Sequence, residues 1–188
     1  VCHYLDMPLQ HASDAMLLAM KRGITQRKTM DLISKFRRIV PDLAMRTTFI
    51  VGFPGETDKD FEQLINFMRE IRFERLGIFT YSQESGTPAA AMPNQVPEDV
   101  KQGRLEQAML VQQEISSENN RRYLGQTLKV LIDEKVDHQD HQWIGRTFMD
   151  APEVDGNVYV NSEKTLEVGR FYRVRIKSTQ EYDLVGEA

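Results

Sequence analysis

The sequence predicts an α/β segment, part of a larger barrel or open sheet, followed by a small all-β barrel. Strand and helix patterns alternate up to about residue 122, which is typical of parallel strands joined by right-handed crossovers. After Gly125 the pattern changes to short strands separated by turn residues. A chain of 188 residues, 40% of them hydrophobic, can build one or two domains with a buried core. We expect one domain over residues 1–122 and a second over residues 123–188.

Three strands and four helices are expected in the first domain. The strands are predicted at 4–9, 43–51 and 76–81, and the helices from Ser13 or Asp14 to Gly23, from Thr25 to Pro41, at 57–72 and at 98–122. Apolar residues at helical spacing define a buried stripe on the third helix: Phe61, Leu64, Ile65, Met68 and Ile71. The same argument predicts a buried face on the fourth: Leu105, Ala108, Met109, Gln112 and Ile115. Three strands would leave two open edges, and the chain enters its first strand without a lead-in, so we expect a fragment.

The second domain is expected to close into a barrel of the oligonucleotide-binding size class. Five short strands are predicted at 127–133, 142–148, 157–160, 171–176 and 182–185. His138 and His141 fall between the first two strands, where we expect an exposed hairpin tip and no metal site.

Charge and cysteine content limit the classes of function. Residues 123–188 contain 8 Lys and Arg and 12 Asp and Glu, so the whole net charge of −4 lies in the second domain. An acidic barrel suits a basic protein partner better than a nucleic acid, although a generally acidic, soluble surface would look the same. One cysteine, Cys2, excludes an internal disulfide framework and a cluster held by this chain alone. No apolar run approaches the ~20 residues that span a bilayer, and no segment resembles a signal peptide, so we expect a cytoplasmic protein.

A glycine-rich turn at the end of the second strand is the strongest candidate for a ligand loop. The β-branched and aromatic run ends in Gly52-Phe53-Pro54-Gly55, and a helix follows. Ligands of parallel α/β folds bind at the carboxyl ends of the strands, and glycine lets a ligand approach the backbone. An ordinary strand-to-helix turn is the alternative. The loop over residues 82–97 is long enough to be functional or disordered.

Several motifs follow one another in order along the first domain. They are Pro-Leu-Gln-His-Ala-Ser-Asp at 8–14, Met-Lys-Arg-Gly-Ile-Thr at 20–25, Arg46 to Thr57, Tyr81-Ser82, Gly-Thr-Pro-Ala-Ala at 86–90 and Gln-Val-Pro at 95–97. Together they resemble the methylthiotransferases of the radical S-adenosylmethionine (SAM) superfamily. Asp150 to Gly156 and Tyr182 to Glu187 resemble the TRAM domain. The resemblance implies a partial TIM-like barrel, incomplete here, followed by a five-stranded, OB-like TRAM barrel.

The resemblance also implies a branch of the family. The tRNA-modifying members carry Ser-Gly where this chain has His11-Ala12, and they lack the segment at 150–156. Both differences resemble the branch that adds a methylthio group to the β-carbon of an aspartate in ribosomal protein uS12. The acidic TRAM domain would then bind uS12 or the ribosome. A tRNA adenosine methylthiotransferase that binds RNA directly, and a non-catalytic binding fragment, are the alternatives.

The family's cofactors are SAM and two [4Fe-4S] clusters. One cluster needs a CxxxCxxC motif and the other needs three more cysteines, and Cys2 matches neither requirement. We therefore expect the cluster ligands upstream of residue 1, and we assign no catalytic or metal-binding residue to this chain.

Part of the SAM site is expected here. Arg22 is the candidate for the SAM carboxylate, although a solvated arginine at a helix end is the alternative. Gln10 and Ser13 could bind the ribose, although Ser13 is also a good N-cap. The resemblance places three further residues beside the adenine: Ile50, Gly52 and Phe53. Glu56 is expected to cap the following helix.

Five residues are candidates for the substrate side of the site. His11 distinguishes the branches and could face the aspartate substrate or the second cluster. Arg46 could reach the SAM carboxylate or the substrate, or form a structural ion pair. Tyr81, Ser82 and Thr87 border the long loop.

Overall fold

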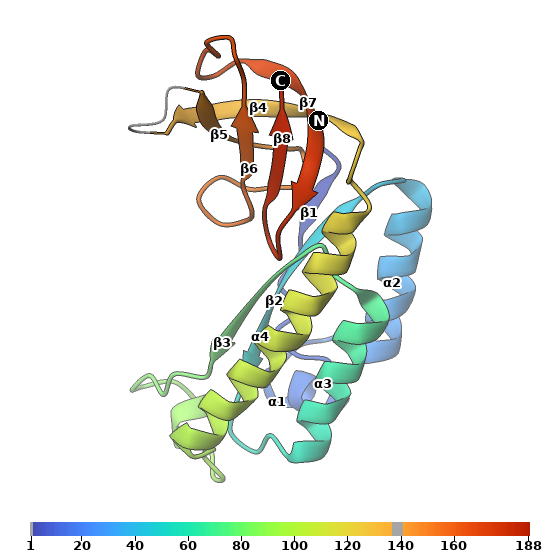
Figure 1. Cartoon of the computed structure of the whole chain (residues 1–188). Coiled ribbons are helices and arrows are strands. Elements are labelled where there is room, and N and C mark those ends of the chain that lie inside the picture. Colours follow the sequence, from blue (N-terminus) through green and yellow to red (C-terminus); the bar gives the residue numbers. More distant parts are fainter. Residues whose placement is uncertain (1, 137–140) are drawn as a thin grey trace. The chain divides into compact units, whose positions relative to one another are not determined.

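Residues 2–136 and 141–188 are described by the structure, a computed structural model (Figure 1). The chain divides into two units, one of residues 5–112 and the other of residues 113–188 with the N-terminal residues up to Tyr4. The domain boundary expected after residue 122 stays a prediction. His138 lies outside the described residues. His141 is exposed, and its Nδ1 lies 3.2 Å from the carbonyl oxygen of Ser162.

A three-stranded sheet in the order β1–β2–β3 forms the centre of the first unit. The strands are β1 (Tyr4–Asp6), β2 (Ala44–Val51) and β3 (Arg75–Thr80). β2 and β3 pair in parallel, which confirms the predicted α/β class. β1 is shorter than expected because Pro8 has no N–H to donate to the ladder. Pairing resumes at Gln10, which forms an isolated parallel bridge with Phe49.

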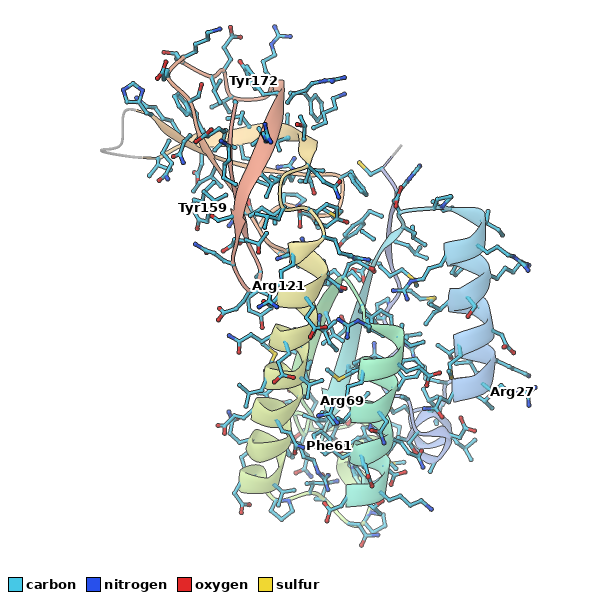
Figure 2. All side chains as sticks on the ribbon, turned by 45° about the vertical axis from the view of Figure 1, so that its right-hand side comes forward. Arg27, Phe61, Arg69, Arg121, Tyr159 and Tyr172 are labelled. Atoms are coloured by element: carbon cyan, nitrogen blue, oxygen red, sulfur yellow. The ribbon has the colours of Figure 1, made fainter. Side chains whose placement is uncertain are left out.

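Four α-helices connect and follow these strands. They are α1 (Asp14–Ala19), α2 (Gln26–Ile39), α3 (Asp58–Ile71) and α4 (Glu98–Arg121), with a short 3-10 helix, η1 (Ala89–Ala91), in the long loop. α1 ends before the predicted Gly23 because Lys21 adopts a left-handed conformation with φ of 56°. Figure 1 shows α2, α3 and α4 side by side along the sheet, and Arg27 on α2 extends away from it in Figure 2. No helix in the described part of the chain is long and apolar enough to cross a membrane.

The predicted stripe of α3 is buried as expected. All five of its residues, together with Phe67, have buried side chains. Phe67 and Phe73 pack against Phe49 of β2, with ring centroids 6.2 Å and 5.9 Å from it in edge-to-face geometry. Such aromatic pairs stabilise the contact beyond the area they bury. One face of the sheet is therefore sealed by the helices.

The predicted buried face of α4 is confirmed in part: Ala108, Gln112 and Ile115 are buried, and Leu105 is half-buried. Met109 is 38% exposed, whereas several polar residues of the helix are buried at helical spacing: Lys101, Arg104, Gln112, Ser116, Asn119 and Asn120. Buried polar side chains need hydrogen-bond partners, and they have them here. Gln112 Nε2, for example, donates to the carbonyl oxygen of Phe73. The apolar pattern therefore predicted part of this face and missed the other polar residues that belong to it.

A capping box begins α3. The Thr57 hydroxyl accepts a hydrogen bond from the backbone N–H of Asp60, and the Asp60 carboxylate accepts one from the N–H of Thr57. Asp60 also accepts from the hydroxyl of Ser13, at 2.5 Å. Burial raises the pKa of Asp60, but the hydrogen bonds from Ser13 and Thr57 outweigh this effect and hold that pKa below its ordinary value. The ionised carboxylate is thus part of the folded structure.

Acidification is expected to release this cap. A carboxyl group whose pKa is lowered on folding stabilises the fold above its unfolded pKa, about 4, and loses that contribution as the pH falls through the folded pKa. The opening free energy of α3, measured by hydrogen exchange between pH 5 and pH 3, should therefore fall more steeply in the parent protein than in Asp60→Asn. Parallel curves for the two proteins would show that Asp60 does not contribute.

The second unit contains a closed barrel, as the sequence predicts. Its strands are β4 (Thr127–Lys135), β5 (Gln142–Arg146), β6 (Val158–Asn161), β7 (Phe171–Thr179) and β8 (Leu184–Glu187), and they close in the order β4–β5–β6–β8–β7. Alternate side chains fill the interior around Trp143, which is 1% exposed. Closure pairs every strand on both sides and so removes exposed sheet edges.

Candidate functional site

A cavity of about 780 Å³ opens at the carboxyl ends of the three parallel strands. Seven predicted site residues line it: Gln10, Arg22, Ile50, Phe53, Tyr81, Ser82 and Thr87. The other four, His11, Ser13, Arg46 and Gly52, are not among its lining residues. The volume falls in the range of sites for cofactor-sized ligands.

The sheet face opposite the helices supplies one wall. Thr48 and Ile50 of β2 both line the cavity. Phe79 of β3 pairs with Ile50 in the parallel register, and Phe79 is 58% exposed. Thr48 and Phe79 were not predicted from the sequence. The period of two along a strand could have identified both, because Thr48 lies two residues before Ile50 and Phe79 lies two residues before Tyr81.

Gln10 enters the cavity from a constrained backbone. Its φ is 73°, which is uncommon for a residue with a side chain. Its N–H donates to the carbonyl oxygen of Thr48, and its own carbonyl oxygen accepts from the N–H of Ile50. Both backbone groups are used by β2, so the side chain alone is left to bind a ligand.

An aromatic pair forms the apolar part of the wall. Phe53 and Tyr81 meet edge to face with centroids 5.3 Å apart, and Met16 completes their buried cluster. Ile50 and Met92 pack against this cluster. The Tyr81 hydroxyl is buried and has no hydrogen-bond partner in the described part of the chain. Such a wall suits a flat, aromatic group such as a nucleobase.

Polar side chains occupy the rim. Arg22 is exposed, and its Nη2 donates to the carbonyl oxygen of Pro8 at 2.9 Å. The hydroxyls of Ser82 and Thr87 donate to the side chain and the carbonyl oxygen of Glu84, respectively. The guanidinium of Arg22 still has further N–H groups with which to grip a carboxylate.

Glu56 does not cap α3 as expected, because Thr57 is the N-cap residue. Its carboxylate is fully buried and turns back into the glycine-rich turn instead. Glu56 Oε2 accepts from the N–H of Gly52 at 2.6 Å and from that of Phe53 at 3.3 Å. Glu56 Oε1 accepts from Arg104 Nη1 at 3.0 Å. The correction has a physical reason: a buried carboxylate needs strong donors, and the turn and α4 supply them.

Gly52 is required by two features of this turn. Its φ is 74°, and a Cβ placed on it would lie 2.3 Å from Cγ of Lys101. Its N–H is bonded to Glu56, as is that of Phe53. The N–H groups of Gly52 and Phe53 are therefore already used within the protein.

The remaining predicted residues lie behind or beside the cavity. The Ser13 hydroxyl is bonded to Asp60, and Ser13 makes no side-chain cap on α1. Arg46 Nη1 pairs with Asp6 Oδ2 at 2.9 Å, the structural ion pair that the sequence left open. The His11 side chain is completely buried, 3.6 Å from Glu56. The described residues contain no group of His, Cys, Asp or Glu that could hold a metal ion.

Comparison with known proteins defines the class. Residues 1–68 match the Radical SAM superfamily, and residues 124–188 match the TRAM domain. The Escherichia coli coproporphyrinogen III oxidase HemN, described as a radical SAM enzyme, has a similar fold, with a TM-score of 0.51. It is 14% identical, and the match covers 78% of this chain and 39% of that protein. The chain therefore combines a radical SAM segment with a TRAM barrel.

Relatives that match the whole chain are more specific. The ribosomal protein uS12 methylthiotransferase RimO of Desulfitobacterium hafniense is 51% identical over 100% of this chain. RimO of Clostridioides difficile is 47% identical over the same extent, and RimO of Vibrio vulnificus is 50% identical over 97% of the chain. The chain is thus similar over its whole length to the methylthiotransferase RimO. It spans 42%, 42% and 38% of the lengths of these relatives, respectively.

Proposed function

We propose that this chain is the C-terminal part of a radical SAM methylthiotransferase that adds a methylthio group to the β-carbon of an aspartate in uS12. The observation that carries the proposal is the 51% identity with a uS12 methylthiotransferase over the whole chain. The cavity at the carboxyl ends of the strands supports it, because ligands of such barrels bind there.

The cavity residues fit SAM. Phe53, Tyr81 and Ile50 form an apolar surface for the adenine ring, and Arg22 at the rim can bind the carboxylate of the amino-acid end. The Gln10 side chain can bind ribose hydroxyls. Since the N–H groups of Gly52 and Phe53 are bonded to Glu56, backbone carbonyl oxygens would accept from the adenine amino group.

SAM supplies radical chemistry and a methyl group when it is bound beside an iron–sulfur cluster. The role of the present residues is to bind and orient it and to exclude water from its adenine side. The chain has a single cysteine, Cys2, and spans 42% of its relatives. We place the ligands of two [4Fe-4S] clusters in the remainder of such a protein, and we place the protein in the cytoplasm with its ribosomal substrate.

The charge of the barrel supports a basic protein partner. Residues 123–188 carry the net charge of −4, which complements a basic ribosomal protein such as uS12 and would slow its encounter with RNA. Complementary charge steers association more than it sets affinity.

One face of the barrel favours RNA contact as a second candidate. Lys129 on β4 lies opposite Arg173 on β7, and both are exposed together with Arg175. Phe171 is 59% exposed, with Lys129 Nζ 4.3 Å from its ring centroid. Cations around an exposed aromatic ring suit a phosphate backbone with a stacked base.

One experiment separates the two substrates. The full-length protein with reconstituted clusters is incubated with SAM, a reductant and a sulfur source, and with either uS12 in ribosomes or tRNA, both from cells that lack these modifications. We expect mass spectrometry to find one methylthio group in place of hydrogen on an aspartate of uS12, and unchanged tRNA nucleosides. Modified tRNA with unmodified uS12 would overturn the proposal in favour of the tRNA branch.

A further inference from the structure

A buried polar cluster lies behind the cavity wall. It consists of His11, Glu56 and Arg104, with side-chain exposures of 0%, 0% and 8%. His11 directly follows Gln10, which lines the cavity, but its own side chain points to the opposite side of the backbone, toward Glu56.

The hydrogen bonds define the tautomer of His11. The backbone N–H of Ser13 donates to Nδ1 of His11 at 2.9 Å, so Nδ1 is an acceptor and carries no proton. The proton of the neutral ring is therefore on Nε2. Nε2 is buried without a hydrogen-bond partner in the described residues, and Glu56 Oε2 lies 3.6 Å from it.

Glu56 connects this N–H to the cavity wall. The oxygen that faces His11 is the one that accepts from the N–H groups of Gly52 and Phe53. The other oxygen is held by Arg104. The carboxylate is thus held at both oxygens, and its orientation determines where the backbone of Phe53 lies. Phe53 in turn packs its ring on Tyr81.

We propose that His11 is a positioning residue of the SAM cavity, which acts through Glu56 on the backbone of Gly52 and Phe53. The assignment deepens the proposed function, and it rests on that function for SAM as the ligand. The Nε2–H of His11 stabilises the charge of Glu56 in a site that excludes water, where electrostatic contacts are strong.

Two substitutions of His11 separate this role from a purely local one. His11→Asn can still accept from the N–H of Ser13, because its amide lies near the position of Nδ1, but it cannot reach Glu56. His11→Gln can place an amide N–H near the position of Nε2, but it loses the contact with Ser13. The two variants thus each retain one of the two contacts.

The test uses the full-length protein with its clusters reconstituted, and two measurements. Hydrogen exchange of the peptide over residues 50–57, measured without ligand, reports how strongly the amides of the turn are protected by their hydrogen bonds to Glu56. Calorimetry with S-adenosylhomocysteine, a non-reactive probe, reports the affinity of the cavity for its ligand. In His11→Asn we expect exchange of the Gly52 and Phe53 amides to be about tenfold faster and binding about five- to tenfold weaker, whereas His11→Gln should restore both to within about twofold of the parent.

Each outcome decides a separate point. If His11→Asn showed the same amide exchange and the same binding as the unsubstituted protein, the positioning role would be overturned and His11 would be assigned to the local turn. This holds whether or not His11→Gln is impaired. If the parent protein bound no S-adenosylhomocysteine, the proposed function would fail. The exchange data would still show whether His11 acts on the turn through Glu56.

Discussion

Replacement of Glu56 by alanine is expected to lower the opening free energy of the first unit by about 3–5 kcal/mol, the usual effect of removing one partner of a buried ion pair. The substitution leaves Arg104 buried with the exposed Asp58 as its charged partner. It also removes the acceptor of the Gly52 and Phe53 N–H groups. Unsatisfied buried donors add to the loss.

Hydrogen exchange of the β2 and α3 amides in the full-length protein measures this free energy. Glu98→Ala is the matched control, because Glu98 also pairs with a buried cation of α4, Lys101, but its own side chain is 75% exposed. Glu98→Ala should lower the opening free energy by less than about 1 kcal/mol. If Glu56→Ala does not fold, Glu56→Gln retains an acceptor for the turn and should show a smaller loss. Equal effects of Glu56→Ala and Glu98→Ala would contradict the role of Glu56.

Gly52→Ala is expected to have the second largest effect. It should lower the opening free energy of the first unit by about 2–5 kcal/mol, because backbone strain and overpacking act together. The φ of 74° is unfavourable for any residue with a Cβ, and the new methyl group would lie 2.3 Å from Cγ of Lys101. Lys101 is 7% exposed and has little room to move. The displaced turn would also shift Phe53 in the cavity wall.

Gly55→Ala is the control for the strain alone. Gly55 has a similar φ of 84°, but no atom lies within 4 Å of the position where a Cβ would be. Gly55→Ala should therefore lower the opening free energy by about 1–2 kcal/mol. The difference between the two variants, measured by exchange of the same amides, gives the cost of the contact with Lys101. If Gly55→Ala were as damaging as Gly52→Ala, this contact would not matter.

Much of the fold was predictable because its signals are local. The buried stripe of α3 follows from apolar spacing, although its N-cap is Thr57 where Glu56 was expected. α4 was harder to predict. Arg104 is buried there through a partner far away in the chain, so the apolar pattern predicted only part of the buried face.

The site was predictable only in part. The motif resemblance placed Phe53, Tyr81 and Arg22 together, and all three line the cavity. It could not predict that Glu56 turns away from its helix, nor that His11 faces Glu56 while its neighbour Gln10 lines the cavity. Both depend on which side of the backbone a side chain takes in an irregular segment, where no period applies.

The sequence by itself determined the order and type of the elements, the change from α/β to all-β architecture and the family, because these depend on local periodicity and ordered motifs. Only the tertiary structure decided which polar groups meet. Glu56 binds Arg104 across 48 residues of sequence, and this pair, with His11, holds the turn that the sequence identified. A buried charge takes its partner from whatever the fold brings near, and spacing along the chain carries no information about that choice.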